Sequence, residues 1–202
     1  MSVDGTSPEK NNTHLSIKFD ESRYTRSVES SGQALPSPLE SLRNTWLWPM
    51  DSSAPAEISQ FYGEFLENHN HNGIDIQAPI GTSIIAPHGG KVLIMEDKAR
   101  NRLWQVSLGD VVHDENLGLL QEFAHLDLSD FQANLKNDQL IEAGQVIGKV
   151  GEFQNGDFSN PHLHYGVEHS EVKAFVLPLI KGLRINPLSL LRDLRVAPAL
   201  IE

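Results

Sequence analysis

The 202-residue chain contains no cysteine. This absence excludes structural disulfides, thiolate metal sites and thiol nucleophiles together. Any site with nitrogen ligands for a metal must therefore use histidine, with Asp or Glu beside it. The chain has nine histidines, so the useful question is which of them lie close enough together to hold an ion.

Basic residues are also scarce. Lys and Arg number 16 against 27 Asp and Glu, which gives a net charge of −11. Binding to nucleic acid or to anionic lipid depends on positive charge, so we expect neither partner. No apolar run approaches the ~18 residues of a membrane helix, so no transmembrane segment is expected. The first residues also lack the basic and then apolar pattern of a signal peptide.

Residues 1–45 differ in character from the rest of the chain. They are polar and turn-rich, with little periodicity, which predicts a tail, a linker or a pro-segment. They hold 6 acidic and 5 basic residues, so ten of the eleven excess negative charges lie in residues 46–202. We predict a single domain over 46–202.

Short apolar runs separated by Gly, Pro, Asn and Asp follow Trp46. Their length and their content of Val, Ile and Leu predict strands, and many short strands with Gly-rich turns predict an all-β sandwich or barrel. The predicted strands cover 73–77, 83–86, 91–95, 103–108, 119–124, 145–150 and 163–167. Two hairpin-like stretches, 78–92 and 141–150, echo each other. Asn186 as N-cap and Pro187 in the first turn predict a short C-terminal helix through Leu194.

The first histidine cluster is His71-Asn72-Gly73-Ile74-Asp75. On an extended backbone, positions four apart point to the same face, so His71 and Asp75 can form half of a zinc site. Gly73 between them lets the backbone approach a neighbour closely.

The second cluster is His162-Leu163-His164. The spacing of two places both imidazoles on one face of a strand and turns Leu163 into the core. His125, at the end of an apolar strand, is a third candidate. Each cluster alone also fits an ordinary hydrogen-bonded histidine, and the combination is what favours a metal site.

At these residues the sequence resembles the lysostaphin/LytM-type zinc metalloendopeptidases, a family of cell-wall peptidases. The motifs occur in the family's order over about residues 46–194. They are Trp48-Pro49, Phe61-Tyr62-Gly63, His71 to Asp75, Ala78–Thr82, Ala86 to Val92, Ala124-His125-Leu126, Gly144 to Gly151, Pro161 to Tyr165, and Asn186-Pro187.

The resemblance implies an antiparallel β-sandwich or barrel-sandwich hybrid with a short C-terminal helix. It implies Zn²⁺ as cofactor, with His71, Asp75 and His164 as ligands. His125 and His162 would be the catalytic histidines beside the metal, and the sequence leaves their division of labour open. The reaction implied is hydrolysis of peptide bonds in peptidoglycan by a zinc-bound water, outside the cytoplasm, in the periplasm or beyond the cell. We expect a monomer.

Three departures from the family pattern concern substrate contacts rather than ligands. An Arg that the family often shows after its Phe-Gly motif is absent, and Glu64-Phe65-Leu66 stands there. Phe123 stands directly before Ala124-His125-Leu126, where the family often has an aromatic residue with a hydroxyl group. Gly166 stands where an acidic residue is common.

Two alternatives to an active peptidase remain. One is a catalytically silent domain of this fold that activates another cell-wall hydrolase, although such relatives usually lose ligands. The other is a sugar-transport phosphocarrier domain, which also pairs histidines but leaves Asp75 unexplained. Among peptidase substrates, Gly-Gly bridges and D-Ala–diaminopimelate crosslinks both stay open. The remaining histidines are predicted outside the site: His69 in a solvated loop, His88 in an exposed turn, His113 in an exposed polar loop, His169 at a solvated strand end, and His14 in the tail.

Overall fold

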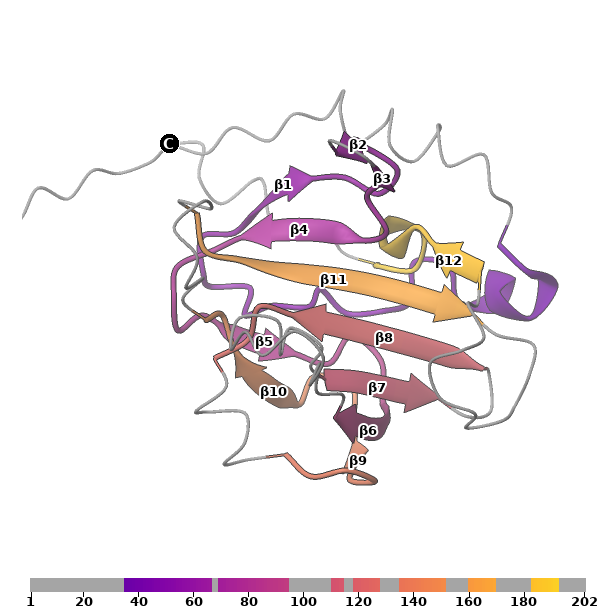
Figure 1. The fold of residues 1–202 in the computed structure, drawn as a ribbon. Coiled ribbons are helices and arrows are strands. Elements are labelled where there is room, and N and C mark those ends of the chain that lie inside the picture. Colours follow the sequence, from indigo (N-terminus) through magenta and orange to yellow (C-terminus); the bar gives the residue numbers. More distant parts are fainter. Residues whose placement is uncertain are drawn as a thin grey trace, which may run out of the picture.

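A computed structural model of the chain describes residues 35–66, 69–94, 110–114, 118–127, 135–151, 160–169 and 183–192. The fold of this part is nearly all β, as predicted, and it curls around one core (Figure 1). Its helices are two 3-10 helices, η1 (Ser37–Leu42) and η3 (Pro187–Ser189). Neither they nor any other helix in the described ranges is long and apolar enough to cross a membrane.

The main sheet has eight antiparallel strands in the order β1-β4-β11-β8-β7-β6-β9, with β12 also paired to β11. Its central strand is the longest, β11. One edge of β11 pairs with β8, and the other pairs first with β4 and then with β12. The strands are β1 (Glu57–Gln60), β4 (Ile74–Gln77), β6 (Gly90–Ile94), β7 (Asp110–Asp114), β8 (Leu119–Ala124), β9 (Leu140–Ile141), β11 (His162–His169) and β12 (Leu183–Ile185).

Two further pairs of strands flank this sheet. One joins β5 (Ser83–Ile85) to β10 (Val146–Lys149), so the two echoing stretches of sequence pair with each other. The other is the small hairpin of β2 (Phe65–Leu66) and β3 (His69–Asn70). Residues 1–34 and the predicted strand 103–108 lie outside the described ranges.

Alternation along β11 separates a core face from an open face. Leu163, Tyr165 and Val167 are fully buried, whereas His162 and His164 between them are only partly buried. The core holds further large side chains from other elements, including Trp46, Phe123 and Leu39 of η1. The prediction that Leu163 points into the core is confirmed, and His162 and His164 lie on the opposite face.

Three predictions about the remaining histidines were wrong. His169 is buried rather than solvated, because alternation places it on the same face as Val167. His88 is partly buried, with its ring centroid 4.9 Å from that of Trp46. His113 lies in β7, not in a loop. His69 is exposed as predicted, but it lies in β3 rather than in a loop.

The C-terminal helix is shorter than predicted. Asn186 does cap it, since its side-chain oxygen accepts a hydrogen bond from the Leu188 N–H at 3.1 Å. The helix nevertheless ends at Ser189. The next residues pair with Trp46 instead: the Trp46 N–H donates to Leu190, and the Arg192 N–H donates to Trp46. Tertiary pairing therefore takes the place of further helical turns.

Replacing Asn186 by Ala should lower the free energy of unfolding by about 1 kcal/mol, the usual cost of losing an N-cap. The buried Leu188 N–H would lose its acceptor. Urea denaturation of the variant measures this effect. Asn70→Ala, at an exposed position in β3, is the matched control and should change stability by less than about 0.5 kcal/mol. Equal losses in the two variants would contradict a capping role for Asn186.

Candidate metal centre

The fold brings together Asp75 and His164 from two neighbouring strands and His71 from the segment just before one of them. Asp75 of β4 and His164 of β11 are direct partners in the antiparallel register. Cross-strand partners point to the same face of a sheet, so the carboxylate and the imidazole meet on the open face. His71 precedes β4 and reaches the same point.

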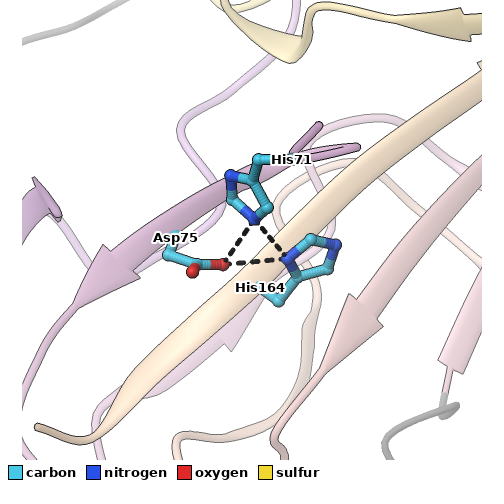
Figure 2. A group of neighbouring side chains, drawn as sticks. All are labelled: His71, Asp75 and His164. Carbon is cyan, nitrogen blue, oxygen red and sulfur yellow. Dashed lines mark hydrogen bonds and ion pairs between the residues drawn. The ribbon is translucent and has the colours of Figure 1, made fainter. Parts of the chain in front are cut away.

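Three donor atoms converge there (Figure 2). His164 Nδ1 lies 2.8 Å from Asp75 Oδ1. His71 Nε2 lies 3.1 Å from His164 Nδ1 and 3.2 Å from Asp75 Oδ1. All three side chains are largely buried, with 4% of His71, 12% of Asp75 and 13% of His164 exposed.

Gly73 is what allows this approach. A Cβ built on Gly73 would lie 2.5 Å from the Tyr165 carbonyl oxygen and 2.9 Å from two atoms of the His164 ring. Real Cβ atoms do not approach other atoms so closely. The sequence-based expectation of close backbone contact at Gly73 is confirmed.

A hydrogen bond on the side away from the other two ligands sets the orientation of the His71 ring. Its Nδ1 lies 3.1 Å from the Phe61 carbonyl oxygen. A carbonyl oxygen can only accept, so Nδ1 carries the proton and donates it. In the neutral ring this leaves the lone pair on Nε2, directed toward Asp75 and His164. Such outer hydrogen bonds fix the tautomer of histidines that bind metals.

The electrostatics of the group favour a positive charge at its centre. In the metal-free chain, burial would raise the pKa of Asp75, but hydrogen bonds from His164 and His71 outweigh burial and hold that pKa well below its usual range. Burial would lower the pKa of His71, yet the Asp75 carboxylate raises it overall. The Asp75 carboxylate stabilises positive charge at this point, whether a proton or a metal cation carries it.

The donor set fits a zinc ion. Ligands of a tetrahedral zinc at about 2.0–2.1 Å lie about 3.3–3.4 Å from one another. The three separations observed, 2.8–3.2 Å, need only a slight expansion to match. Two imidazoles and one carboxylate are also ligand types that zinc prefers. Three protein ligands leave a fourth position open, which is typical of catalytic rather than structural zinc.

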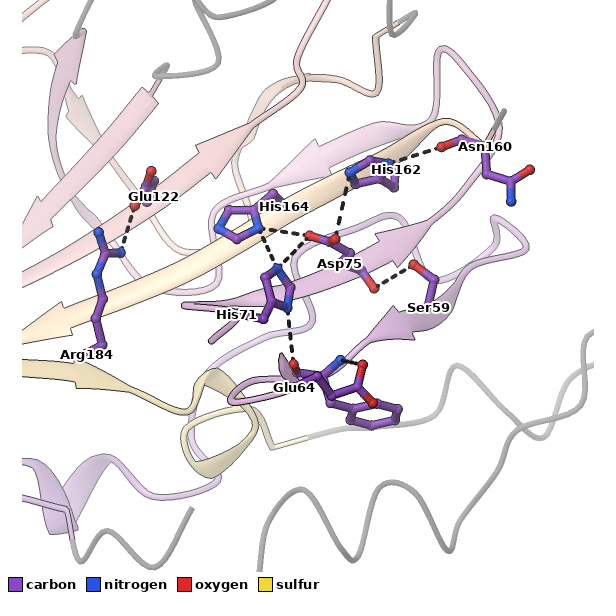
Figure 3. A network of polar contacts seen from close by, with 10 residues as sticks. Ser59, Glu64, His71, Asp75, Glu122, Asn160, His162, His164 and Arg184 are labelled. Carbon is purple, nitrogen blue, oxygen red and sulfur yellow. Dashed lines mark hydrogen bonds and ion pairs between the residues drawn. The ribbon is translucent and has the colours of Figure 1, made fainter. Parts of the chain in front are cut away.

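His125 and His162 line the same place. Their ring centroids are 4.6 Å apart, and that of His125 is 6.4 Å from that of His164. The Nδ1 of His162 lies 3.0 Å from the Asn160 carbonyl oxygen, to which it donates. This bond turns Nε2 toward the site, where it lies 3.9 Å from Asp75 Oδ2 (Figure 3).

His125 follows β8 with an unusual backbone, φ 66°. Left-handed backbone is uncommon for a residue with a side chain, and outside turns such residues cluster at functional sites. Gly151 packs against Leu126, the residue after His125, since a Cβ on Gly151 would lie 2.7 Å from the Leu126 carbonyl. Burial, together with His162 and His164 nearby, lowers the pKa of His125 to about 3, so its imidazole is neutral.

The structure thus gathers all five predicted site residues at one point on the open face. Sequence reasoning missed the groups that orient them, the carbonyls of Phe61 and Asn160. It also missed an ion-pair cluster nearby. Arg184 contacts Glu122 at 2.7 Å (Figure 3) and Glu168 at 3.2 Å. Gly166 gives Arg184 its room, since a Cβ there would lie 3.2 Å from Nη1.

The fold and the site together place the chain in a broad class, that of all-β proteins with a His–Asp–His group on the sheet that is close enough to hold a metal ion. Comparison with known proteins gives the family. The chain belongs to peptidase family M23, whose model matches residues 69–178, and the family predicted from the motifs is confirmed.

Two relatives illustrate the match. The L-Ala–D-Glu endopeptidase of Bacillus subtilis is 34% identical over 104 residues, 48% of this chain and 29% of that protein. The peptidoglycan DD-endopeptidase ShyB of Vibrio cholerae is 30% identical over 120 residues, 57% of this chain and 25% of that protein. The chain therefore spans less than a third of the length of either relative.

Among solved structures, that of the SpoIIQ–SpoIIIAH pore-forming complex matches with a TM-score of 0.51 and 19% identity. The match covers 74% of this chain and 93% of the other. A likeness at this identity supports the fold alone.

Proposed function

We propose that the chain is a zinc-dependent endopeptidase that hydrolyses peptide bonds in peptidoglycan. The observation that carries the proposal is the convergence of His71 Nε2, Asp75 Oδ1 and His164 Nδ1 within 3.2 Å of one another. Membership of a peptidoglycan peptidase family supports the substrate class. We assign the activity to the predicted domain of residues 46–202, against whose core Leu39 of η1 also packs, and we propose that it acts as a monomer.

In this proposal His71, Asp75 and His164 hold the metal. When bound, zinc supplies Lewis-acid chemistry, lowering the pKa of a water molecule to about 7 and polarising a carbonyl group. The Phe61 carbonyl keeps the His71 lone pair directed inward, and β4 and β11 fix the other two ligands. The protein therefore contributes a preorganised site on rigid strands.

His162 and His125 are proposed to act in general acid–base catalysis. Hydrolysis joins the oxygen of one water to the carbonyl carbon, breaks the C–N bond and leaves a carboxylate and an amine. One proton must travel from the water to the leaving nitrogen. His162 has its Nε2 turned toward the site by the bond to Asn160 and can take and return that proton. The neutral His125 ring next to it offers a second nitrogen within reach of the same centre.

The peptide bond itself is not fixed by the family. The two relatives are named for different bonds, one between L-Ala and D-Glu and one in DD-linked peptides. Peptidoglycan lies outside the cytoplasm, so we place the activity in the periplasm or outside the cell. Analysis of fragments released from purified sacculi would identify the bond.

Metal removal is the direct test. We expect 1,10-phenanthroline to stop the release of peptide fragments from sacculi, and stoichiometric zinc to restore it, because the proposed reaction depends on the metal to polarise the scissile carbonyl. Metal analysis of the purified chain should give about one zinc per molecule. Full hydrolysis after complete metal removal would contradict the proposal. A chain that binds no zinc and releases nothing would instead be the catalytically silent domain considered above.

A further inference from the structure

The turn Phe61–Glu64 grips His71 through its backbone. The His71 N–H donates to the Glu64 carbonyl at 2.7 Å, and the Gly63 N–H donates to the His71 carbonyl at 2.9 Å. Gly63 has φ +80°, a value that side chains rarely allow. The backbone of the metal-site histidine is therefore anchored to this turn, separately from the contacts of its ring.

The same turn orients the ring. The Phe61 carbonyl accepts from His71 Nδ1 at 3.1 Å and also from the Glu64 N–H at 3.3 Å. Phe61 itself is buried, with 3% exposed. Any rotation of the Phe61 peptide would move the one acceptor that fixes the His71 tautomer.

The side chain of Glu64 closes this turn. Its Oε2 accepts from the Phe61 N–H at 3.2 Å. The carboxylate and the backbone N–H of one residue thus hold both ends of Phe61, and Glu64 lies directly beside His71 (Figure 3). Glu64 is also where the sequence departs from the family pattern.

We propose that Glu64 is a positioning residue for the metal centre, which clamps Phe61 so that its carbonyl holds the His71 ring with Nε2 directed at Asp75 and His164. This inference rests on the proposed function, because the ring matters most as a ligand. The competing role is a purely structural one, in which Glu64 only braces the β2–β3 hairpin that follows it.

The experiment compares three variants of the full chain. Glu64→Ala removes the acceptor. Glu64→Gln keeps an oxygen that can accept from the Phe61 N–H but removes the charge. Phe65→Ala, at the neighbouring position with 72% exposed, is the control. Zinc affinity is measured by competition with a chelator, the ligand geometry by the visible spectrum of bound Co²⁺, and the His71 tautomer by ring ¹⁵N shifts in the metal-free protein.

We expect Glu64→Ala to lower zinc affinity about tenfold or more, as loss of outer-shell partners does. Its Co²⁺ spectrum should change, and its His71 should populate both tautomers. Glu64→Gln should stay within about threefold of the parent chain in affinity and keep one tautomer. Phe65→Ala should behave as the parent. If Glu64→Ala does not fold, Glu64→Asp, one methylene shorter, takes its place with the same expectation.

Two results would overturn the inference. One is a Glu64→Ala chain with unchanged zinc affinity, spectrum and tautomer, which leaves only the bracing role. The other is a Glu64→Gln chain as impaired as Glu64→Ala, since the clamp requires only an acceptor. If the parent chain binds neither zinc nor Co²⁺, the proposed function fails separately, and the ¹⁵N shifts of the metal-free variants still decide whether Glu64 holds His71.

Discussion

Replacing His164 by Ala should abolish both zinc binding and peptidoglycan hydrolysis. The change removes one of three donors and the hydrogen bond at 2.8 Å to Asp75. A catalytic metal contributes several kcal/mol to the transition state, and each 1.36 kcal/mol is a factor of ten in rate. We therefore expect hydrolysis to fall by about a thousandfold or more. Fragment release from sacculi measures the loss, and metal analysis measures the zinc.

His69→Ala is the matched control, because it deletes an exposed histidine two positions from His71 that the site does not use. It should keep full zinc content and activity. A thermal scan adds an independent readout. Zinc should raise the melting temperature of the parent and of His69→Ala, since a ligand bound only by the folded state stabilises it. His164→Ala should show no such rise. Retained zinc and activity in His164→Ala would refute the assigned ligand set.

The two halves of the site were predictable because alternation on a strand is a local rule. His162 and His164 lie two apart on β11, so this rule places them together from the sequence alone. His71 and Asp75 also meet, as the spacing of four predicted, although His71 lies before β4 rather than on it. The order of strands is not local. Only the resemblance to a family put Asp75 and His164 in one ligand set. They meet because β4 lies beside β11 with Asp75 opposite His164.

The polar strands escaped prediction for a related reason. The segment Asp110–Asp114 forms β7 within the main sheet, although two of its five residues are Asp. Strand prediction depends on apolar content, whereas a strand between two others is held by backbone pairing whatever its side chains. The same limit applies to β12 (Leu183–Ile185), which carries Arg184.

The orienting groups of the site lie beyond sequence reasoning altogether. Phe61 and Asn160 act through backbone carbonyls, which every residue possesses, so residue type gives no signal. Glu64 acts on a neighbour's N–H, and in the sequence it appeared only as a departure from a pattern. Ligand types can be predicted from chemistry, but their orientation depends on how loops meet strands.

Gly73→Ala should damage stability and metal binding together. The added methyl would lie 2.5 Å from the Tyr165 carbonyl oxygen and 2.9 Å from the His164 ring. Backbone on a central strand cannot give way cheaply, so we expect the free energy of unfolding of the metal-free protein to fall by about 1–3 kcal/mol. The His164 ring must also shift, and zinc affinity should fall by about ten- to a hundredfold, as when ligands lose their positioning. Urea denaturation and chelator competition measure the two effects.

Gly166→Ala is the control that separates crowding at the site from a general cost of replacing glycine in the sheet. Gly166 lies on β11 two residues from His164, and a Cβ there would meet Arg184 Nη1 at 3.2 Å. That contact is the far end of a flexible side chain, which can move by a few tenths of an ångström. We expect less than about 1 kcal/mol of destabilisation and unchanged zinc affinity. Equal losses in the two variants would mean that any glycine in or beside this part of the sheet is costly to replace. A selective loss of metal affinity in Gly73→Ala would show that Gly73 belongs to the site because it keeps the space that His164 requires.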